Sequence, residues 1–176
     1  MSQLKTAVGP DDHTQGPLDA LIVLLEYGDY ECPYCGEAYP ELKAVQKAMG
    51  DSLCFAFRNF PLGNAHPHAE RAAEFAEAAA TIGRFWEMHD TLYEHQDALD
   101  DRSLVRYAKH LGFDDALIES ALNGDYATRI RRDFTGGVRS GVNGTPSLFV
   151  NGQRYDGPRD ADTLVALFRQ VLARHR

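Results

Sequence analysis

Two cysteines separated by a proline and a tyrosine, Cys32-Pro33-Tyr34-Cys35, carry the clearest chemical signal in this sequence. The apolar run at residues 21–25 predicts a buried strand before them, and a helical pattern follows at 34–49. The first turn of a helix has unpaired N–H groups and the positive end of the dipole, which both favour a thiolate. Pro33 suits the first helical position, so Cys32 is expected at the cap, with Cys35 one turn further on the same face.

This spacing predicts a pair that cycles between dithiol and disulfide. We expect Cys32 to face solvent and attack, and Cys35 to be shielded and to resolve the mixed disulfide. A Cys-x-x-Cys pair is also half of a zinc site, and it can form a static disulfide. The only other cysteine, Cys54, lies in a strand-like run and is expected to be a buried apolar filler. The redox dithiol is therefore favoured over zinc and over a static bond.

The composition is that of an ordinary globular domain: 176 residues, 44% hydrophobic and 25% charged. The net charge of −8 argues against nucleic acid or an anionic membrane as the main partner. The first ten residues carry no apolar signal region, and no apolar run could span a bilayer. Three cysteines, only two of them paired by motif, fit a reducing compartment, so the cytosol is favoured, or the periplasm if a leader has been removed. A monomer is expected.

The order of predicted elements divides the chain into four parts. An arm at 1–17, with an edge strand at 5–8, precedes a βαβ unit at 18–64. Its strands are expected at 21–27 and 52–58, around a helix at 34–49 that contains Pro40. A helical insertion is expected at 65–141 and a ββα unit at 142–176. Asn151-Gly152 is a strong hairpin turn signal between strands at 147–150 and 153–155, and a closing helix spans 160–174.

Within the insertion, an alanine-rich helix is expected from His66 onward, with His66 as its cap and Pro67 in its first turn. Its solvent-facing side is assigned to Glu70, Glu74 and Glu77. The following helices are expected at 84–96, 102–111, 114–122 and 125–139. His66, His68, His89 and His95 would have to converge to form a metal site, and structural roles are favoured for them. An aromatic stripe is interpreted as core and not as a cofactor site: Phe85, Trp86, Met88, Leu92 and Tyr93. The basic residues Arg129, Arg131 and Arg132 are interpreted as a solvated helix face in preference to a site for acidic substrates.

This order of elements resembles the α/β thioredoxin fold, and the all-helical insertion between its βαβ and ββα halves resembles the DsbA-like thiol–disulfide oxidoreductases. The resemblance implies protein or small-molecule thiols and disulfides as substrates, and a redox recycling partner. It implies no cofactor besides the redox-active disulfide, with glutathione as a candidate reductant. It also implies that Thr145-Pro146 is a cis-proline loop that binds substrate. Glu26 is then a buried acid that exchanges a proton with Cys35.

Two features depart from the family pattern. Tyr34 stands where the founding DsbA-type proteins carry histidine, and Cys-Pro-Tyr-Cys is the glutaredoxin sequence, although the glutathione-binding Gly-Gly-x-Asp stretch is missing. The acidic neighbours Asp29, Glu31 and Glu37 oppose a thiolate, so we expect a potential nearer about −200 to −230 mV than the about −120 mV of DsbA. The alternatives are a non-catalytic thioredoxin-fold binding or chaperone module, and a glutathione-dependent transferase or isomerase of the kappa-like class.

Overall fold

The computed structural model describes residues 2–176, which pack as two compact units. The sheet unit consists of the residues up to Gly28, Glu37–Arg58 and Gly136–Arg176. The helical unit consists of Asp29–Gly36 and Asn59–Thr135. The segment with both cysteines therefore belongs to the helical unit. Within residues 2–176, no helix combines the length and apolar character that a membrane crossing needs.

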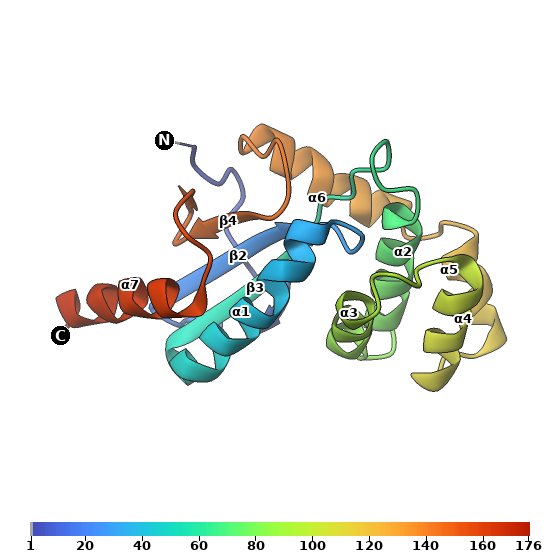
Figure 1. Ribbon diagram of the computed structural model, residues 1–176, viewed down its shortest axis with the longest axis horizontal. Helices are drawn as coiled ribbons and strands as arrows, with labels where there is room; N and C mark the ends of the chain where they lie inside the picture. The colour runs from blue at the N-terminus through green and yellow to red at the C-terminus, as the bar shows by residue number, and fades with distance from the viewer. Residues whose placement is uncertain (1) are drawn as a thin grey trace. The chain divides into compact units, whose positions relative to one another are not determined.

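The sheet unit is built on a five-stranded sheet in the order β1-β3-β2-β4-β5 (Figure 1). Its strands are β1 (His13–Gln15), β2 (Ile22–Gly28), β3 (Leu53–Asn59), β4 (Ser147–Val150) and β5 (Gln153–Tyr155). β1 runs antiparallel to β3, and β4 runs antiparallel to both β2 and β5. The central strands are buried along their length, as their apolar sequences predict.

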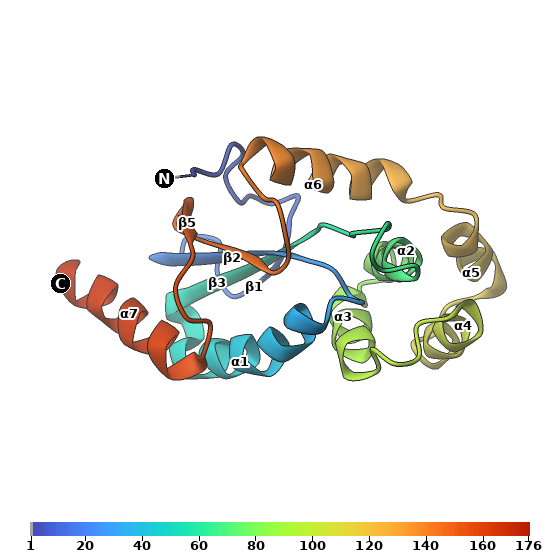
Figure 2. The same cartoon turned by 45° about the horizontal axis from the view of Figure 1, so that its top comes forward.

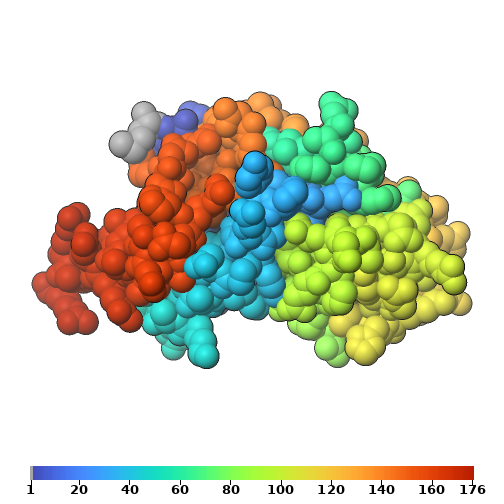
Figure 3. Space-filling model, in the orientation of Figure 1, coloured from blue at the N-terminus to red at the C-terminus, as the bar shows by residue number. Residues whose placement is uncertain are grey.

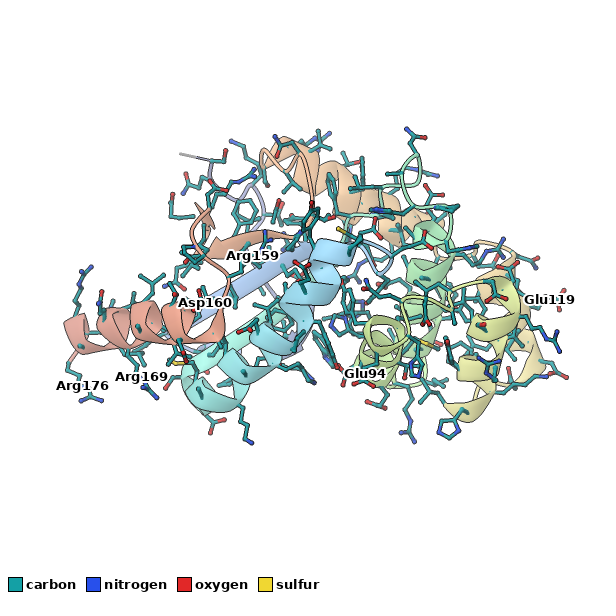
Figure 4. The ribbon with its side chains drawn as sticks, in the orientation of Figure 1. Glu94, Glu119, Arg159, Asp160, Arg169 and Arg176 are labelled. Carbon is teal, nitrogen blue, oxygen red and sulfur yellow. The ribbon has the colours of Figure 1, made fainter. Side chains whose placement is uncertain are left out.

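Two helices lie on one face of this sheet, α1 (Pro33–Met49), of which the residues from Glu37 on belong to this unit, and α7 (Ala161–Arg174) (Figure 2). Pro40 lies inside α1, as predicted. Leu42 and Val45 of α1 and Leu164 and Phe168 of α7 are buried. Asp160, labelled in Figure 4, caps α7 by accepting a hydrogen bond from the Thr163 N–H at 2.9 Å.

The predicted hairpin is confirmed between β4 and β5. Asn151 and Gly152 have φ angles of 48° and 81°, which the two central residues of a type I′ turn require. The Asn151 side chain also accepts a hydrogen bond from the Val23 N–H at 2.8 Å. The turn is therefore tied to β2 as well as to its own strands.

The N-terminal arm is held by a buried arginine instead of the predicted edge strand at residues 5–8. That prediction is wrong: the edge strand is β1, further along the chain. Arg58 pairs with both carboxylate oxygens of Asp12, at 2.7 and 2.9 Å. Its guanidinium also donates to the Thr6 and Ala7 carbonyls and to the Tyr27 hydroxyl. Bonding to one buried charge therefore holds Thr6, Ala7 and Asp12 of the arm, whereas Ser2 and Leu4 bond to the backbone of the β4–β5 hairpin.

The helical unit contains α2 (Ala69–Ala80), α3 (Phe85–Glu94), α4 (Asp101–His110), α5 (Asp115–Leu122) and the first part of α6 (Ala127–Arg139). α2 contacts α3, α4 and α5, and its alanines allow these helices to approach closely. Figure 3 shows α3 and α4 packed together on the viewed face, in yellow-green. Phe85, Met88, Leu92 and Tyr93 of the predicted aromatic stripe are buried and Trp86 is half-buried, which confirms its structural role.

Two glutamates assigned to the solvent side of α2 are buried, so that part of the prediction is wrong. Glu74 is 6% exposed and Glu77 is 4% exposed. Glu74 Oε2 accepts a hydrogen bond from the Tyr126 N–H, and Glu77 Oε2 accepts one from the Asn59 side-chain amide. Burial raises the pKa of Glu74, although the Tyr126 bond and the charge of Arg71 oppose it. These partners lie far away in the sequence, so helical periodicity could not indicate them.

Asn59, the last residue of β3, joins carboxylates from two helices. Its side-chain amide donates to Glu77 Oε2 of α2 at 2.9 Å and to Asp133 Oδ2 of α6 at 3.0 Å. Its backbone N–H donates to the same Asp133 oxygen, also at 3.0 Å. Burial raises the pKa of Asp133, while Arg129 and the Asn59 bonds oppose the rise. The amide of the last strand residue therefore donates hydrogen bonds to two buried carboxylates.

Asn59→Ala is expected to lower the free energy of unfolding by about 2–4 kcal/mol, because each of two buried carboxylates loses a donor. Urea unfolding followed by circular dichroism measures this loss. Asn64→Ala, which removes an exposed amide from the following loop, is the matched control and is expected to stay within about 0.5 kcal/mol. An Asn59→Ala protein as stable as this control would contradict the role given to the amide.

Candidate active site

The cysteine pair lies at the start of α1, as the sequence predicts. Pro33 is the first residue of the helix, so Cys32 directly precedes it and Cys35 lies in its first turn. The Cys32 N–H donates to the Asp29 carbonyl, and the Cys32 carbonyl accepts from the Gly36 N–H, both at 3.1 Å. This backbone pattern places a turn over 29–32 directly before the helix.

Both cysteines are buried, which contradicts the expectation that Cys32 faces solvent. Cys32 is 3% exposed and Cys35 is 0% exposed, whereas Tyr34 between them is 61% exposed. One physical reason lies in Gln96, which follows α3. Its side-chain amide donates to the Tyr30 and Cys32 carbonyls, each at 2.9 Å. A side chain distant in sequence therefore lies across the turn that carries the first cysteine.

Gly36, directly after the second cysteine, makes room for this glutamine. A Cβ atom built at position 36 would overlap the side-chain amide of Gln96. The missing side chain thus lets Gln96 approach the helix start and reach both carbonyls. Sequence reasoning missed Gln96, because no local pattern marks a polar residue that bonds to a backbone more than sixty residues away.

Tyr30, which belongs to this turn, is buried and anchors it. The Tyr30 hydroxyl lies 3.0 Å from Nδ1 of His89, and its ring centroid lies 4.9 Å from that of Tyr93. Tyr30 and His89 are both buried. His89, considered as a metal ligand, is thus part of an aromatic cluster under the cysteine turn. Among residues 2–176, no three or more histidine, cysteine, aspartate or glutamate side chains gather closely enough to hold a metal ion.

Asp29 connects the cysteine turn to the loop before α2. Its Oδ1 accepts from the Glu31 N–H at 2.8 Å, and its Oδ2 accepts from the Leu62 N–H at 2.9 Å. Oδ2 also lies 2.7 Å from Nδ1 of His66, and the Asp29 side chain is 0% exposed. The predicted role of His66 as a helix cap is wrong, because α2 begins at Ala69 with His68 at the cap. His66 instead forms an ion pair with Asp29, which lies 37 residues earlier in the sequence.

The charges around His66 determine its protonation. Partial burial alone would lower the pKa of His66, but the hydrogen bond and charge of Asp29 outweigh that effect. The charges of Cys32 and Glu31 add to them, so the pKa lies above its ordinary value. Glu31 has a second role, since its Oε1 accepts from the His68 N–H at 2.8 Å. Asp29 and Glu31, which were expected from the sequence to oppose a thiolate, thus both accept hydrogen bonds within the helical unit.

The other predicted site residues belong to the sheet unit. Glu26 lies in β2, is buried, and is opposite Leu148 of β4 in the register. The Thr145–Pro146 peptide bond is cis and directly precedes β4. A pocket of about 240 Å³ beside these two residues is also lined by Tyr155 and by Arg159, which is labelled in Figure 4. The roles of Glu26, Thr145 and Pro146 toward the cysteines stay predictions.

Cys54 is fully buried in β3, as predicted. Burial and, after it, the charge of Asp12 raise the pKa of its thiol. A thiol in that state is a poor nucleophile, because the thiolate is the reactive form. Cys54 is therefore the least suited of the three cysteines to act as a nucleophile, whereas the roles of Cys32 and Cys35 stay predictions.

A family model described as thioredoxin matches residues 9–169, which is nearly the whole chain. The chain belongs to the thioredoxin family. The structure of oxidised BdbD from Bacillus subtilis superimposes on this thioredoxin-family chain with a TM-score of 0.81 at 23% identity, covering 92% of this chain and 93% of that one. Wolbachia pipientis α-DsbA1 gives 0.83 at 16% identity, covering 95% and 94%. These likenesses confirm the predicted thioredoxin fold with its helical insertion.

The chain is also similar to part of longer proteins. It is 44% identical over 177 residues to the Na⁺/H⁺ antiporter NhaA 3 of Salinispora tropica, which covers 98% of this chain and 27% of that protein. The corresponding figures for NhaA 1 of Salinispora arenicola are 42% over 174 residues, 97% and 26%. The chain therefore spans about a quarter of the length of these curated relatives.

Proposed function

We propose that this thioredoxin-family chain is a DsbA-like thiol–disulfide oxidoreductase, with Cys32 as the nucleophile and Cys35 as the resolving cysteine. The observation that carries the proposal is the placement of the two cysteines around the first turn of α1. Support also comes from the shared fold, since one similar structure is named as the thiol–disulfide exchange protein α-DsbA2 of Wolbachia pipientis (TM-score 0.77, 21% identity, covering 92% of this chain and 88% of that one).

The proposed reaction transfers two electrons between dithiol and disulfide. The Cys32 thiolate attacks one sulfur of a substrate disulfide, so a Cys32–substrate bond forms while the substrate S–S bond breaks. The departing substrate sulfur takes up a proton. Cys35, once deprotonated, attacks the Cys32 sulfur and releases the second substrate thiol. The enzyme is then the oxidised partner, and the same steps in reverse oxidise a substrate dithiol.

The remaining residues take supporting roles in this proposal. Pro33 starts the helix, and Tyr34 is the exposed residue between the two cysteines. Glu26 accepts and returns the proton of Cys35. Thr145 and Pro146 bind an extended substrate segment, which their place beside a pocket before β4 supports.

The proposed partners are protein or small-molecule thiols and disulfides, together with a recycling partner. No cofactor is needed besides the Cys32–Cys35 disulfide, and glutathione is the candidate reductant. We place the reaction in the cytosol and in a monomer. Only one cysteine lies outside the reactive pair, which suits a reducing compartment.

Trapping of the mixed disulfide tests the proposal directly. A Cys35→Ser variant incubated with insulin, a disulfide substrate, is expected to accumulate a covalent adduct on Cys32, because the resolving thiol is gone. Intact-mass and peptide mass spectrometry identify the attached chain and the cysteine that holds it. The matched control, Cys32→Ser combined with Cys35→Ser, is expected to form no adduct. No adduct with Cys35→Ser, or one carried by Cys54, would contradict the assigned roles.

A further inference from the structure

We infer that His66, positioned by Asp29, supplies the positive charge that stabilises the Cys32 thiolate. The inference deepens the proposed function and rests on it, because it concerns the nucleophile of that reaction. Asp29 acts as the positioning residue, and His66 acts as the cationic neighbour of the reacting sulfur.

Asp29 is bonded both to the cysteine turn and to the loop before α2. Its carbonyl accepts the Cys32 N–H at 3.1 Å, so the residue belongs to the cysteine turn. Its buried carboxylate accepts the Leu62 N–H and pairs with His66 at 2.7 Å, so it also holds the following loop. A single side chain thus fixes the imidazole relative to the turn that carries Cys32.

The charges around His66 favour its protonated form. Partial burial lowers the pKa of His66, but the hydrogen bond and charge of Asp29, followed by the charges of Cys32 and Glu31, raise it by more and favour the imidazolium. Without a cation, the carboxylates of Asp29 and Glu31 would oppose a negative sulfur in the same turn. The ion pair offsets the charge of Asp29, and the Cys32 thiolate then interacts with a protonated ring. Asp29 was expected from the sequence to oppose the thiolate, but by holding the protonated His66 it favours the thiolate instead.

His66 is partly shielded from solvent. The His66 side chain is 19% exposed, so its charge is screened less by water than that of a surface histidine. At the neighbouring His68, the hydrogen bond to Glu31 comes from the backbone N–H, which a side-chain substitution keeps. Two histidines two residues apart thus offer a test position and a matched control.

The test measures the reactivity of Cys32 toward iodoacetamide as a function of pH, with the modified cysteine identified by peptide mass spectrometry. His66→Gln is expected to slow the reaction at pH 7 about three- to tenfold and to move its midpoint to higher pH, because the thiolate loses its cation. His68→Gln is expected to match the wild type. His66→Lys, which keeps a positive charge, is expected to recover most of the rate.

A reciprocal measurement uses the unmodified sequence. The ring protons of His66, followed by NMR, are expected to titrate at lower pH after Cys32 is alkylated, because the negative sulfur has been removed. An unchanged His66 titration overturns the inference, as does a His66→Gln protein with the wild-type alkylation profile. Equal slowing in His66→Gln and His66→Lys also overturns it, since that result indicates a structural role. Alkylation requires no exchange partner, so failure of the proposed reaction appears separately, in the trapping experiment.

Discussion

Cys32→Ser is expected to reduce the catalysed reduction of insulin at least about a thousandfold, to the rate of the dithiothreitol background. A serine hydroxyl does not ionise near neutral pH and cannot form the mixed disulfide, so the first covalent step is lost. Turbidity of precipitating insulin chains measures the rate. Cys32 is buried at the start of a helix, so circular dichroism of the variant is needed to show that the fold is retained.

Cys54→Ala is the matched control for that experiment. It also removes a buried thiol, but one that lies in β3 and whose pKa is raised. Its turnover is expected to remain near the wild-type value. Equal turnover by Cys32→Ser and the wild type would instead favour the alternative of a binding module whose cysteines are incidental.

Arg58→Ala is expected to destabilise the sheet unit by about 3–5 kcal/mol, the usual cost of removing one partner of a buried ion pair. The substitution leaves the Asp12 carboxylate without its guanidinium, and the Thr6 and Ala7 carbonyls and the Tyr27 hydroxyl lose a donor. The Asp12 bond and charge raise the pKa of Arg58 despite its burial, so the guanidinium stays charged at every accessible pH. Denaturant unfolding of the purified variant measures the loss.

Arg169→Ala is the control for this loss. Arg169 is an exposed residue of α7, labelled in Figure 4, and its truncation is expected to change stability by less than about 0.5 kcal/mol. An Arg58→Ala protein that unfolds at the same denaturant concentration as Arg169→Ala would show that the arm is held by other contacts.

Local chemistry made several features of the fold predictable. Asn151-Gly152 is one of the dipeptides that a two-residue hairpin favours, and both residues adopt the positive φ angles. Pro33 marks the start of α1, and the apolar stripe around Met88 and Leu92 is buried as its helical spacing predicts. In each case the residues that carry the sequence pattern are the same residues that adopt the predicted structure, or their close neighbours in the chain.

The errors all involve partners that are distant in the sequence. His66 has a good local reason to cap a helix, yet Asp29 offers it a buried carboxylate. Glu74 and Glu77 follow the polar period of α2, but they are buried against Tyr126 and Asn59. No periodicity carries information about such pairs, because they form only when the chain has folded.

Burial of Cys32 has the same origin. A cysteine before a helix is expected at the surface, but the amide of Gln96 bonds to the carbonyls on either side of Glu31. The predicted edge strand at 5–8 failed for a related reason, since Arg58 satisfies backbone carbonyls of the arm from the side. In both places, a single side chain donates hydrogen bonds to two backbone carbonyls.

The shared space between Gly36 and Gln96 couples two positions sixty residues apart. Any larger residue at 36 displaces the amide at 96, and with it both bonds to the cysteine turn. Substitutions at the two positions are therefore not independent: a methyl group gained at one calls for a shorter side chain at the other. In libraries built to vary this chain, the pair belongs in a single randomised block.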